Sequence, residues 1–455
     1  QVEPGNRLLG ERSARALGML LQFGAGVALL LDMHGTTSGL PILNGLFLGT
    51  ALVALAGIFS AFILHRHKQE ILPWESLLGT ILLAWGLIWW FVGGLAEIDR
   101  RGPEDYRMGI VLVFLAGSSL TCDIIERKLV WPAMTWPALS LLPTLALCAL
   151  AGFSDGIHPL AGGGFIGWPL ALGTLYLILY RHESLPERLL GLLHSTALWL
   201  LAWLLCLELA WQFDHWISGS PVWPLIAWGL VPSFLVLLVS ASVGRAPWPL
   251  KRHGDLYLSL GLGPLVLASW AWSLYATAES PGNPFPIRYL PLLNPLDVTF
   301  AVIAVILPLW IRRLGAEFSE FFARHRAMQA FYSIYFATLF IWLNGILARS
   351  VHHWGGVRFR FPALFHSVLF QAALSIFWSL LALCVMVFAT RKRIRAVWLT
   401  GAALLAVVVI KLFAVDLSGT GTVARIVSFV GVGILLLVIG YFSPAPPRNP
   451  EEIQS

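Results

Sequence analysis

The sequence predicts an all-α protein, a polytopic transmembrane helix bundle of about fourteen helices with both termini in the cytoplasm. Of its 455 residues, 58% are hydrophobic and only 12% are charged, whereas soluble globular proteins carry roughly 25% charged residues. Its apolar residues form long runs, and many of its 21 tryptophans stand at the ends of these runs. Indole rings favour the lipid–water interface, so we expect these tryptophans there: Trp74, Trp131, Trp168, Trp223, Trp248, Trp310, Trp354 and Trp398.

Each predicted helix is one of these runs, because a helix needs about 20 apolar residues to cross a bilayer and lipid offers no partner to non-helical backbone. The run after the glycines of "HPLAGGGFIGW" is short enough to be re-entrant, and twelve helices is the alternative count. We expect 1–442 to form a single transmembrane domain and 443–455 to be a flexible Pro-rich cytoplasmic tail. The fourteen runs are 14–31, 42–64, 73–95, 107–124, 132–152, 165–180, 188–210, 222–243, 255–275, 295–313, 328–348, 364–389, 396–415 and 422–442.

Lysine and arginine gather in alternate connections between these runs, which fixes the expected orientation. Cytoplasmic connections of membrane proteins are enriched in these residues, so the basic connections and both termini are placed inside. The formal net charge of +6 is explained by these membrane ends and does not indicate nucleic-acid binding. Examples of the basic positions are Arg66, Arg127, Arg181, Arg252, Arg313 and Arg391.

The segment "EIDRRGPEDYR" places Glu97, Asp99 and Arg100 at the external end of a Trp-rich run. Membrane glycosyltransferases that use polyprenyl-phosphate donors resemble this pattern, with acids in an external loop close to the bilayer. A carboxylate there can act as a general base while arginine holds phosphate, so Glu97 and Asp99 are the catalytic candidates. In the alternative interpretation these residues form the solvent-exposed end of a helix and have no catalytic role.

The segment "KLFAVDLSGTGTVAR" combines Lys411, Asp416 and Arg425 around a glycine-rich turn. In the simpler interpretation Asp416 pairs with Arg425 across the turn and Lys411 extends to the interface; in the functional one the cations line a site for an anionic ligand. Glu208, inside "LLCLELAWQFDHW", is a further charge in an apolar run and a candidate partner for Lys411.

Two further external segments carry polar residues. "SVHHWGGVRFRF" contributes His352, His353 and Arg358 as ligand-binding candidates, with aromatics and arginines arranged to contact lipid phosphates. Adjacent histidines without an HExxH pattern give little indication of a metal site, and we expect no metal and no cofactor. In "YLPLLNPLD", Asn294, Pro295 and Asp297 have the chemistry of a helix N-terminus.

The closing segment "RAVWLTGAALLAVVVIKLFAVDLSGTGTVARIVSFVGVGILLLVIGYFSPAPP" resembles a bacterial family of predicted polytopic membrane proteins catalogued as domain of unknown function 2339. "WGLIWWFVGGLAEI", "HPLAGGGFIGWPLAL", "YLPLLNPLD" and "QAALSIFWSLLAL" resemble the same family. The resemblance implies a multi-pass protein of the bacterial inner membrane. Members are typically longer, so we expect this chain to correspond to their C-terminal part, and no activity or catalytic residue is carried over.

Three functions remain open. A transporter or flippase of a polar or lipid-linked cell-envelope molecule would need a water-filled path to Glu208 and Lys411. An envelope enzyme, such as a lipid-linked glycosyl or acyl transferase, would need a lateral groove at Glu97, Asp99 and Arg100. A scaffold subunit of a membrane complex would need neither. The expected partners are membrane lipids, an anionic or lipid-linked glycan precursor and other membrane-complex subunits, without nucleic acid.

Overall fold

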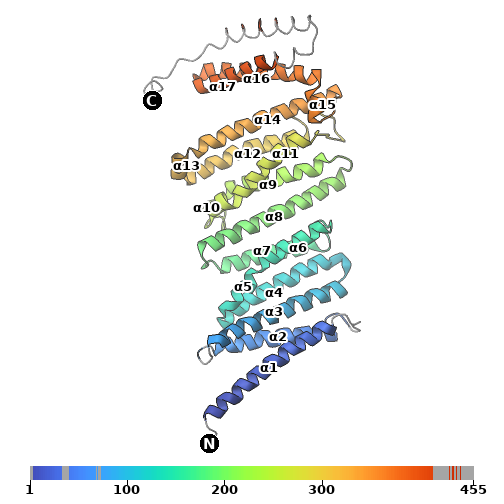
Figure 1. Cartoon of the computed structure of the whole chain (residues 1–455), viewed down its shortest axis with the longest axis vertical. Coiled ribbons are helices and arrows are strands. Elements are labelled where there is room, and N and C mark those ends of the chain that lie inside the picture. Colours follow the sequence, from blue (N-terminus) through green and yellow to red (C-terminus); the bar gives the residue numbers. More distant parts are fainter. Residues whose placement is uncertain are drawn as a thin grey trace. The chain divides into compact units, whose positions relative to one another are not determined.

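The computed structural model describes residues 4–32, 40–67, 69 and 73–412 and the single positions 430, 433, 434, 437 and 441. Helices are the regular structure of these described residues, and no strand occurs among them (Figure 1). The predicted all-α class is therefore correct. The predicted run at 422–442, with Arg425, and the tail at 443–455 lie outside the continuous described segments, as does Asp416.

The chain divides into two compact units, and each is described by itself. Unit 1 comprises Gln1–Gln212 and Leu238–Leu265, and unit 2 comprises Phe213–Leu237 and Val266–Ser455. The single transmembrane domain over 1–442 stays a prediction.

Unit 1 contains the first helices of the chain, and α2, α3, α4 and α7 pack against one another in sequence (Figure 1). Its core is made mainly of leucine and alanine side chains from these helices and from α5, α6 and α8. The elements are α1 (Pro4–Asp32), α2 (Gly45–Arg66), α3 (Pro73–Arg101), α4 (Arg107–Leu129), α5 (Thr135–Leu139), α6 (Leu141–Ser154), α7 (Gly164–Arg181), most of α8 (Glu187–Trp216), the end of α9 (Val222–Ser242), α10 (Gly254–Leu256) and the start of α11 (Leu262–Glu279).

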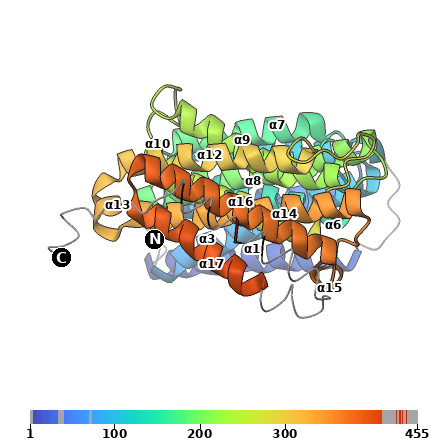
Figure 2. The same ribbon diagram turned by 90° about the horizontal axis from the view of Figure 1, so that it is seen from above.

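Unit 2 contains the end of α8, the remaining parts of α9 and α11, and the helices that follow α11. In Figure 2, α16 and α17 lie side by side. The elements are α12 (Pro295–Glu317), α13 (Ser319–His325), α14 (Ala327–Gly355), α15 (Phe361–Phe365), α16 (Val368–Lys392) and α17 (Arg395–Lys411).

Ten helical segments of the described chain are long and apolar enough to cross a membrane. Each overlaps a predicted run, so a multi-pass membrane protein is supported. Apolar α1 contributes the shorter stretch Leu17–Leu31, and α7 and α17 also coincide with predicted runs. The total of fourteen and the orientation stay predictions. The ten are Gly45–Arg66, Leu77–Arg101, Glu104–Leu129, Pro132–Ser154, Glu187–Trp216, Val222–Ser242, Gly254–Glu279, Pro295–Glu317, Ala327–Gly355 and Val368–Lys392.

Local chemistry explains several helix starts. Asn44 caps α2 by accepting a hydrogen bond from the Phe47 amide, and Ser367 caps α16 in the same way. The predicted cap at α12 is confirmed: the Asn294 side chain accepts from the Asp297 amide at 3.0 Å, and Pro295 occupies the first helical position.

Glycine allows α2 and α3 to approach closely. A Cβ atom added at Gly86 would lie 2.7 Å from the Ala54 carbonyl oxygen, and one at Gly57 would lie 2.9 Å from the Gly86 Cα. Small residues at such contacts are characteristic of membrane helix pairs, in which van der Waals packing replaces the hydrophobic driving force.

The tryptophans do not all follow the sequence-based expectation. Trp131, Trp168 and Trp310 are buried inside the protein, whereas Trp354 is 66% exposed. In several cases the indole N–H has a partner on another helix: Trp90 donates to Ser118 Oγ at 2.9 Å and Trp199 to the Gly261 carbonyl at 2.8 Å. These two rings lie inside α3 and α8 rather than at their ends, and they join helices to one another.

Candidate functional site

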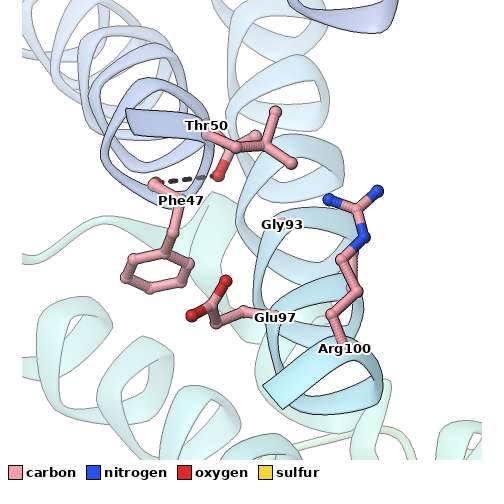
Figure 3. Close-up of a pocket in the computed structure, with 7 residues that line it drawn as sticks. Phe47, Thr50, Gly93, Glu97 and Arg100 are labelled. Carbon is pink, nitrogen blue, oxygen red and sulfur yellow. Dashed lines mark hydrogen bonds between the residues drawn. The ribbon is translucent and has the colours of Figure 1, made fainter. Parts of the chain in front are cut away.

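The first candidate site is a small pocket between the end of α3 and the start of α2, lined by Glu97, Arg100 and Thr50 (Figure 3). The Glu97 carboxylate turns toward Phe47, while the Arg100 side chain extends toward Thr50. The cavity volume is about 10 Å³, which is room for about one water molecule. In this conformation the pocket is too small for a sugar or a lipid headgroup.

Glu97 is 9% exposed and already accepts hydrogen bonds. Its Oε1 atom receives the Ile42 amide at 2.9 Å and the Asn44 side-chain amide at 2.8 Å, and the Arg101 Nε lies 3.5 Å away. The carboxylate therefore joins the segment before α2 to the end of α3. Asp99, in contrast, is 75% exposed and lies 3.5 Å from Arg107, an arrangement that contributes little to stability.

Glu208, on α8, holds the turn that follows α6. Its Oε2 atom lies 3.0 Å from His158 Nδ1 and accepts the Leu160 amide at 3.0 Å, while Gln212 donates to Oε1 at 2.6 Å. The His158 ring stacks on Trp211 with centroids 3.7 Å apart. These contacts explain how an acid is accommodated in an apolar run.

Lys411 ends α17 and contacts α16. Its Nζ atom donates to Ser375 Oγ at 2.8 Å and to the Gln371 carbonyl at 3.1 Å. Lys411 and Glu208 thus each have other partners. The predicted pairing of Asp416 with Arg425 lies outside the described residues.

The two histidines near the end of α14 each meet a backbone carbonyl. His352 Nδ1 lies 2.7 Å from the Val357 oxygen and His353 Nε2 lies 2.8 Å from the Pro281 oxygen. These contacts tie the segment after α14 and the connection between α11 and α12 to the end of α14. Arg358 follows in the exposed segment after α14.

The most buried charges of unit 2 are Asp297 on α12 and Arg349 on α14. Both side chains are 0% exposed, and Arg349 Nη2 lies 2.5 Å from Asp297 Oδ1. Trp342 donates to the same oxygen at 3.0 Å, and Asn294 donates to Oδ2. Asp297 therefore acts as the counter-ion of a buried arginine in addition to its place in the first turn of the helix.

The Arg349 side chain lies against two glycines. A Cβ atom at Gly282 would lie 2.7 Å from the Arg349 Cδ, and one at Gly345 would lie 3.2 Å from Nη1. Within the described chain, Arg349 Nε and Nη1 are buried and form no hydrogen bond of good geometry. Tyr289 lies nearby, with its hydroxyl 3.5 Å from Ser350 Oγ and within interaction range of the Arg349 guanidinium; burial raises the pKa of Tyr289.

Unit 1 contains two polar clusters that sequence reasoning missed. One joins Asp123 and Glu126 on α4 to His182 after α7. In the other, His194 Nδ1 lies 3.0 Å from the Tyr257 hydroxyl, and Glu183 accepts from the Trp248 indole at 2.5 Å. The partners in each cluster come from segments more than 50 residues apart, so no local motif reveals them. The only sequence signal is that charges stand near the ends of apolar runs.

The comparisons agree with the architecture. The family described as "Predicted membrane protein (DUF2339)" matches residues 88–446. Neither a curated protein nor a solved structure matches the chain. Since the match covers well over half of the sequence, which also forms apolar helices of membrane-spanning length, this chain belongs to the DUF2339 family of predicted membrane proteins.

Proposed function

We propose that this protein is a transporter or flippase of the bacterial inner membrane that moves an anionic, lipid-linked precursor of the cell envelope. The observation that carries the proposal is the fully buried Asp297–Arg349 pair, with two guanidinium nitrogens that form no hydrogen bond of good geometry among the described residues. An ionisable residue inside a membrane protein is costly and commonly marks a substrate pathway.

Arg349 has donors left over for a second anion. A guanidinium carries five N–H groups and no acceptor, and the Asp297 carboxylate engages Nη2. The Nε and Nη1 groups are buried and form no hydrogen bond of good geometry in the described chain, and donors left in this state cost roughly 1–3 kcal/mol each. A phosphate or carboxylate that reached them would recover that cost, which gives the site a preference for anions.

A change of counter-ion can couple binding to movement. Without substrate, Asp297 on α12 neutralises Arg349 on α14; an entering anion competes with Asp297 for the same guanidinium. Because Asp297 is part of α12 whereas the entering anion is part of the substrate, the exchange changes the free energy that holds α12 to α14. Binding and helix movement are then linked through this differential interaction.

The lipid-linked character of the substrate rests on the segment after α14. Arg358 and Arg360 are exposed there, and Phe361 is 79% exposed. Arginines beside exposed aromatics suit a surface that meets lipid phosphates. Arg349 lies six residues before Gly355, the end of α14, or ~9 Å by helical rise. A phosphate headgroup held at this segment is therefore close in depth to the buried pair.

The test is binding and flipping of a defined probe, a long-chain polyprenyl phosphate. With the full chain in detergent, we expect the phosphate to bind and the corresponding uncharged polyprenol not to bind. Arg349→Gln should weaken binding at least tenfold, as expected for loss of a charge-assisted hydrogen bond of about 1.5–3 kcal/mol. Arg107→Gln, at an exposed ion pair, is the matched control and should leave the affinity unchanged.

Flipping is then measured in proteoliposomes with a fluorescent polyprenyl phosphate and a membrane-impermeant quencher. Wild-type protein should make the inner-leaflet probe accessible, and Arg349→Gln should not. Equal binding of phosphate and alcohol would overturn the anionic-substrate proposal, while binding without flipping would favour an enzyme.

A second candidate is a lipid-linked transferase at the α2–α3 pocket, favoured by the position of Glu97 and Arg100 on one cavity. As a general base, Glu97 would have to exchange its bonds to Ile42 and Asn44 for the acceptor substrate. Glu97→Gln should then abolish turnover of a polyprenyl-phosphate sugar donor, whereas Asp99→Asn, at an exposed carboxylate, should not. Full activity of Glu97→Gln would exclude this site.

We also propose that both termini are cytoplasmic. In a chain without its native cysteines, Asp155→Cys should react with an impermeant thiol reagent from outside intact cells, and Arg393→Cys only after the membrane is opened. The reverse pattern would contradict this orientation.

A further inference from the structure

The end of α4 and the residue after α7 bring together three potential metal ligands in unit 1. Asp123 and Glu126 are three residues apart and lie on one face of α4, and His182 follows α7. One carboxylate oxygen from each acid and one ring nitrogen of His182 all lie within 4.8 Å of one another. Asp123 and His182 are buried, and Glu126 is half-buried.

Asp123 places in this cluster a carboxylate oxygen that forms no hydrogen bond. Its side chain is 0% exposed, and Arg181 Nη1 binds Oδ2 at 2.5 Å. Oδ1 is buried without a hydrogen-bond partner in the described chain; His182 Nδ1 lies 3.5 Å from it and Arg127 Nε lies 3.9 Å from it. A buried carboxylate oxygen without a donor is costly, and a metal ion would satisfy it.

His182 faces acceptors on both sides of its ring. Its Nδ1 lies 2.9 Å from the Ile178 carbonyl oxygen, and its Nε2 lies 2.9 Å from Glu126 Oε2. The Ile178 carbonyl oxygen can only accept, so Nδ1 donates to it. Nε2 faces Glu126 Oε2 and is positioned to share a metal ion with it.

We propose that Asp123, Glu126 and His182 bind a divalent transition-metal ion of the Zn²⁺ class. Imidazole nitrogen with two carboxylate oxygens is a ligand set that Zn²⁺ accepts, at about 2.0–2.2 Å. Two such ligands at the tetrahedral angle lie roughly 3.3 Å apart, so His182 Nε2 and Glu126 Oε2, which are 2.9 Å apart, would separate slightly on binding. A carboxylate oxygen of Asp123 lies within 4.8 Å of ligand atoms of both other residues and would have to move closer to complete the site.

The surrounding contacts match those of a metal site. A ligating histidine commonly donates its other N–H to a backbone carbonyl, as His182 Nδ1 does to Ile178. Thr135 donates to Glu126 Oε1 at 3.1 Å, which leaves Oε2 for the ion. Arg181 engages Oδ2 of Asp123 and leaves Oδ1 free for the metal. The ion would link α4 to α7 at the helix ends that the predicted orientation places on the cytoplasmic side of the membrane.

The experiment measures zinc in the full chain purified in detergent and dialysed against dilute ZnCl₂. We expect close to one zinc per chain by elemental analysis, falling to background in Glu126→Gln and in His182→Gln. His65→Gln is the matched control, because His65 lies at the end of α2 and its contact with Val130 is exposed; it should retain the zinc. Manganese added in excess should displace little of it.

Zinc X-ray absorption of the wild-type chain gives an independent reading that needs no variant to fold. We expect nitrogen and oxygen neighbours at about 2.0–2.2 Å and no sulfur at about 2.3 Å. Zinc at background in wild-type protein, zinc retained by Glu126→Gln and His182→Gln, or a sulfur-containing shell would each overturn the proposal. So would a His182 ring that carries protons on both nitrogens in zinc-saturated protein, as read from its ¹⁵N resonances.

Discussion

Arg349 and Asp297 form an ion pair in which both side chains are fully buried, 2.5 Å apart between α14 and α12. Trp342 and Asn294 donate further hydrogen bonds to the same carboxylate, so the acid has several donors while the arginine has one strong acceptor. Both oxygens of the carboxylate therefore accept hydrogen bonds, whereas Nε and Nη1 of the guanidinium are buried and form no hydrogen bond of good geometry in the described chain.

Removal of one partner should destabilise unit 2 strongly. Asp297→Leu leaves the Arg349 charge buried without a counter-ion, which costs about 3–5 kcal/mol. The double variant Asp297→Leu/Arg349→Met should recover most of this loss, because neither charge then remains. Thermal unfolding in detergent measures both, and a double variant no more stable than Asp297→Leu would contradict a specific pair. Flipping should be lost in both variants.

The glycine that contacts Arg349 permits a matched test of the site. Gly282 has φ +67°, and its added Cβ would lie 2.7 Å from Arg349 Cδ; Gly156 has φ +70° and nothing within 4 Å. Alanine at either position carries the same left-handed strain, roughly 1 kcal/mol or more. Gly282→Ala should therefore lower the melting temperature further than Gly156→Ala, and should weaken polyprenyl-phosphate binding where Gly156→Ala does not. Equal effects of the two substitutions on stability and binding would show that Gly282 is not part of the site.

The close approach of α2 and α3 predicts a large difference between two other glycines. Gly86→Ala places a Cβ 2.7 Å from the Ala54 carbonyl oxygen, a backbone atom that cannot rotate away, whereas Gly117, on α4, has nothing within 4 Å. Overpacking of this kind costs typically 1–3 kcal/mol. Gly86→Ala should lower the unfolding temperature, and Gly117→Ala should leave it unchanged or raise it because alanine favours the helix. Thermal unfolding followed by circular dichroism measures both temperatures, and equal values for the two variants would contradict the close contact between α2 and α3.

Local chemistry was enough to predict most of the helices and the start of α12. The apolar runs coincide with helices because lipid leaves the backbone no alternative, and Asn294, Pro295 and Asp297 identify a helix N-terminus by the side-chain and dihedral preferences of three neighbouring residues.

Side-chain partners were beyond such reasoning. Glu208 was predicted to need one, but its partner His158 lies 50 residues away in the chain, and the acceptor of Arg349 lies 52 residues away. Which charges meet depends on how helices pack, and packing is set by many weak contacts that no short motif encodes. For the same reason Trp131 and Trp168, which sequence position alone assigns to the lipid interface, are buried.

Lys411 offers the clearest separation between structural support and ligand binding. Its Nζ atom donates to Ser375 Oγ and to the Gln371 carbonyl, and these bonds join α17 to α16. Lys411→Met keeps the aliphatic stem and removes both, so the unfolding free energy should fall by about 1–3 kcal/mol, while Lys392→Met, in the exposed last turn of α16, should change it little. Because Lys411 is engaged by α16, we expect polyprenyl-phosphate affinity to stay within twofold of wild type. A tenfold loss of affinity without loss of stability would instead make Lys411 a ligand-binding residue, as the cationic interpretation of the sequence proposes.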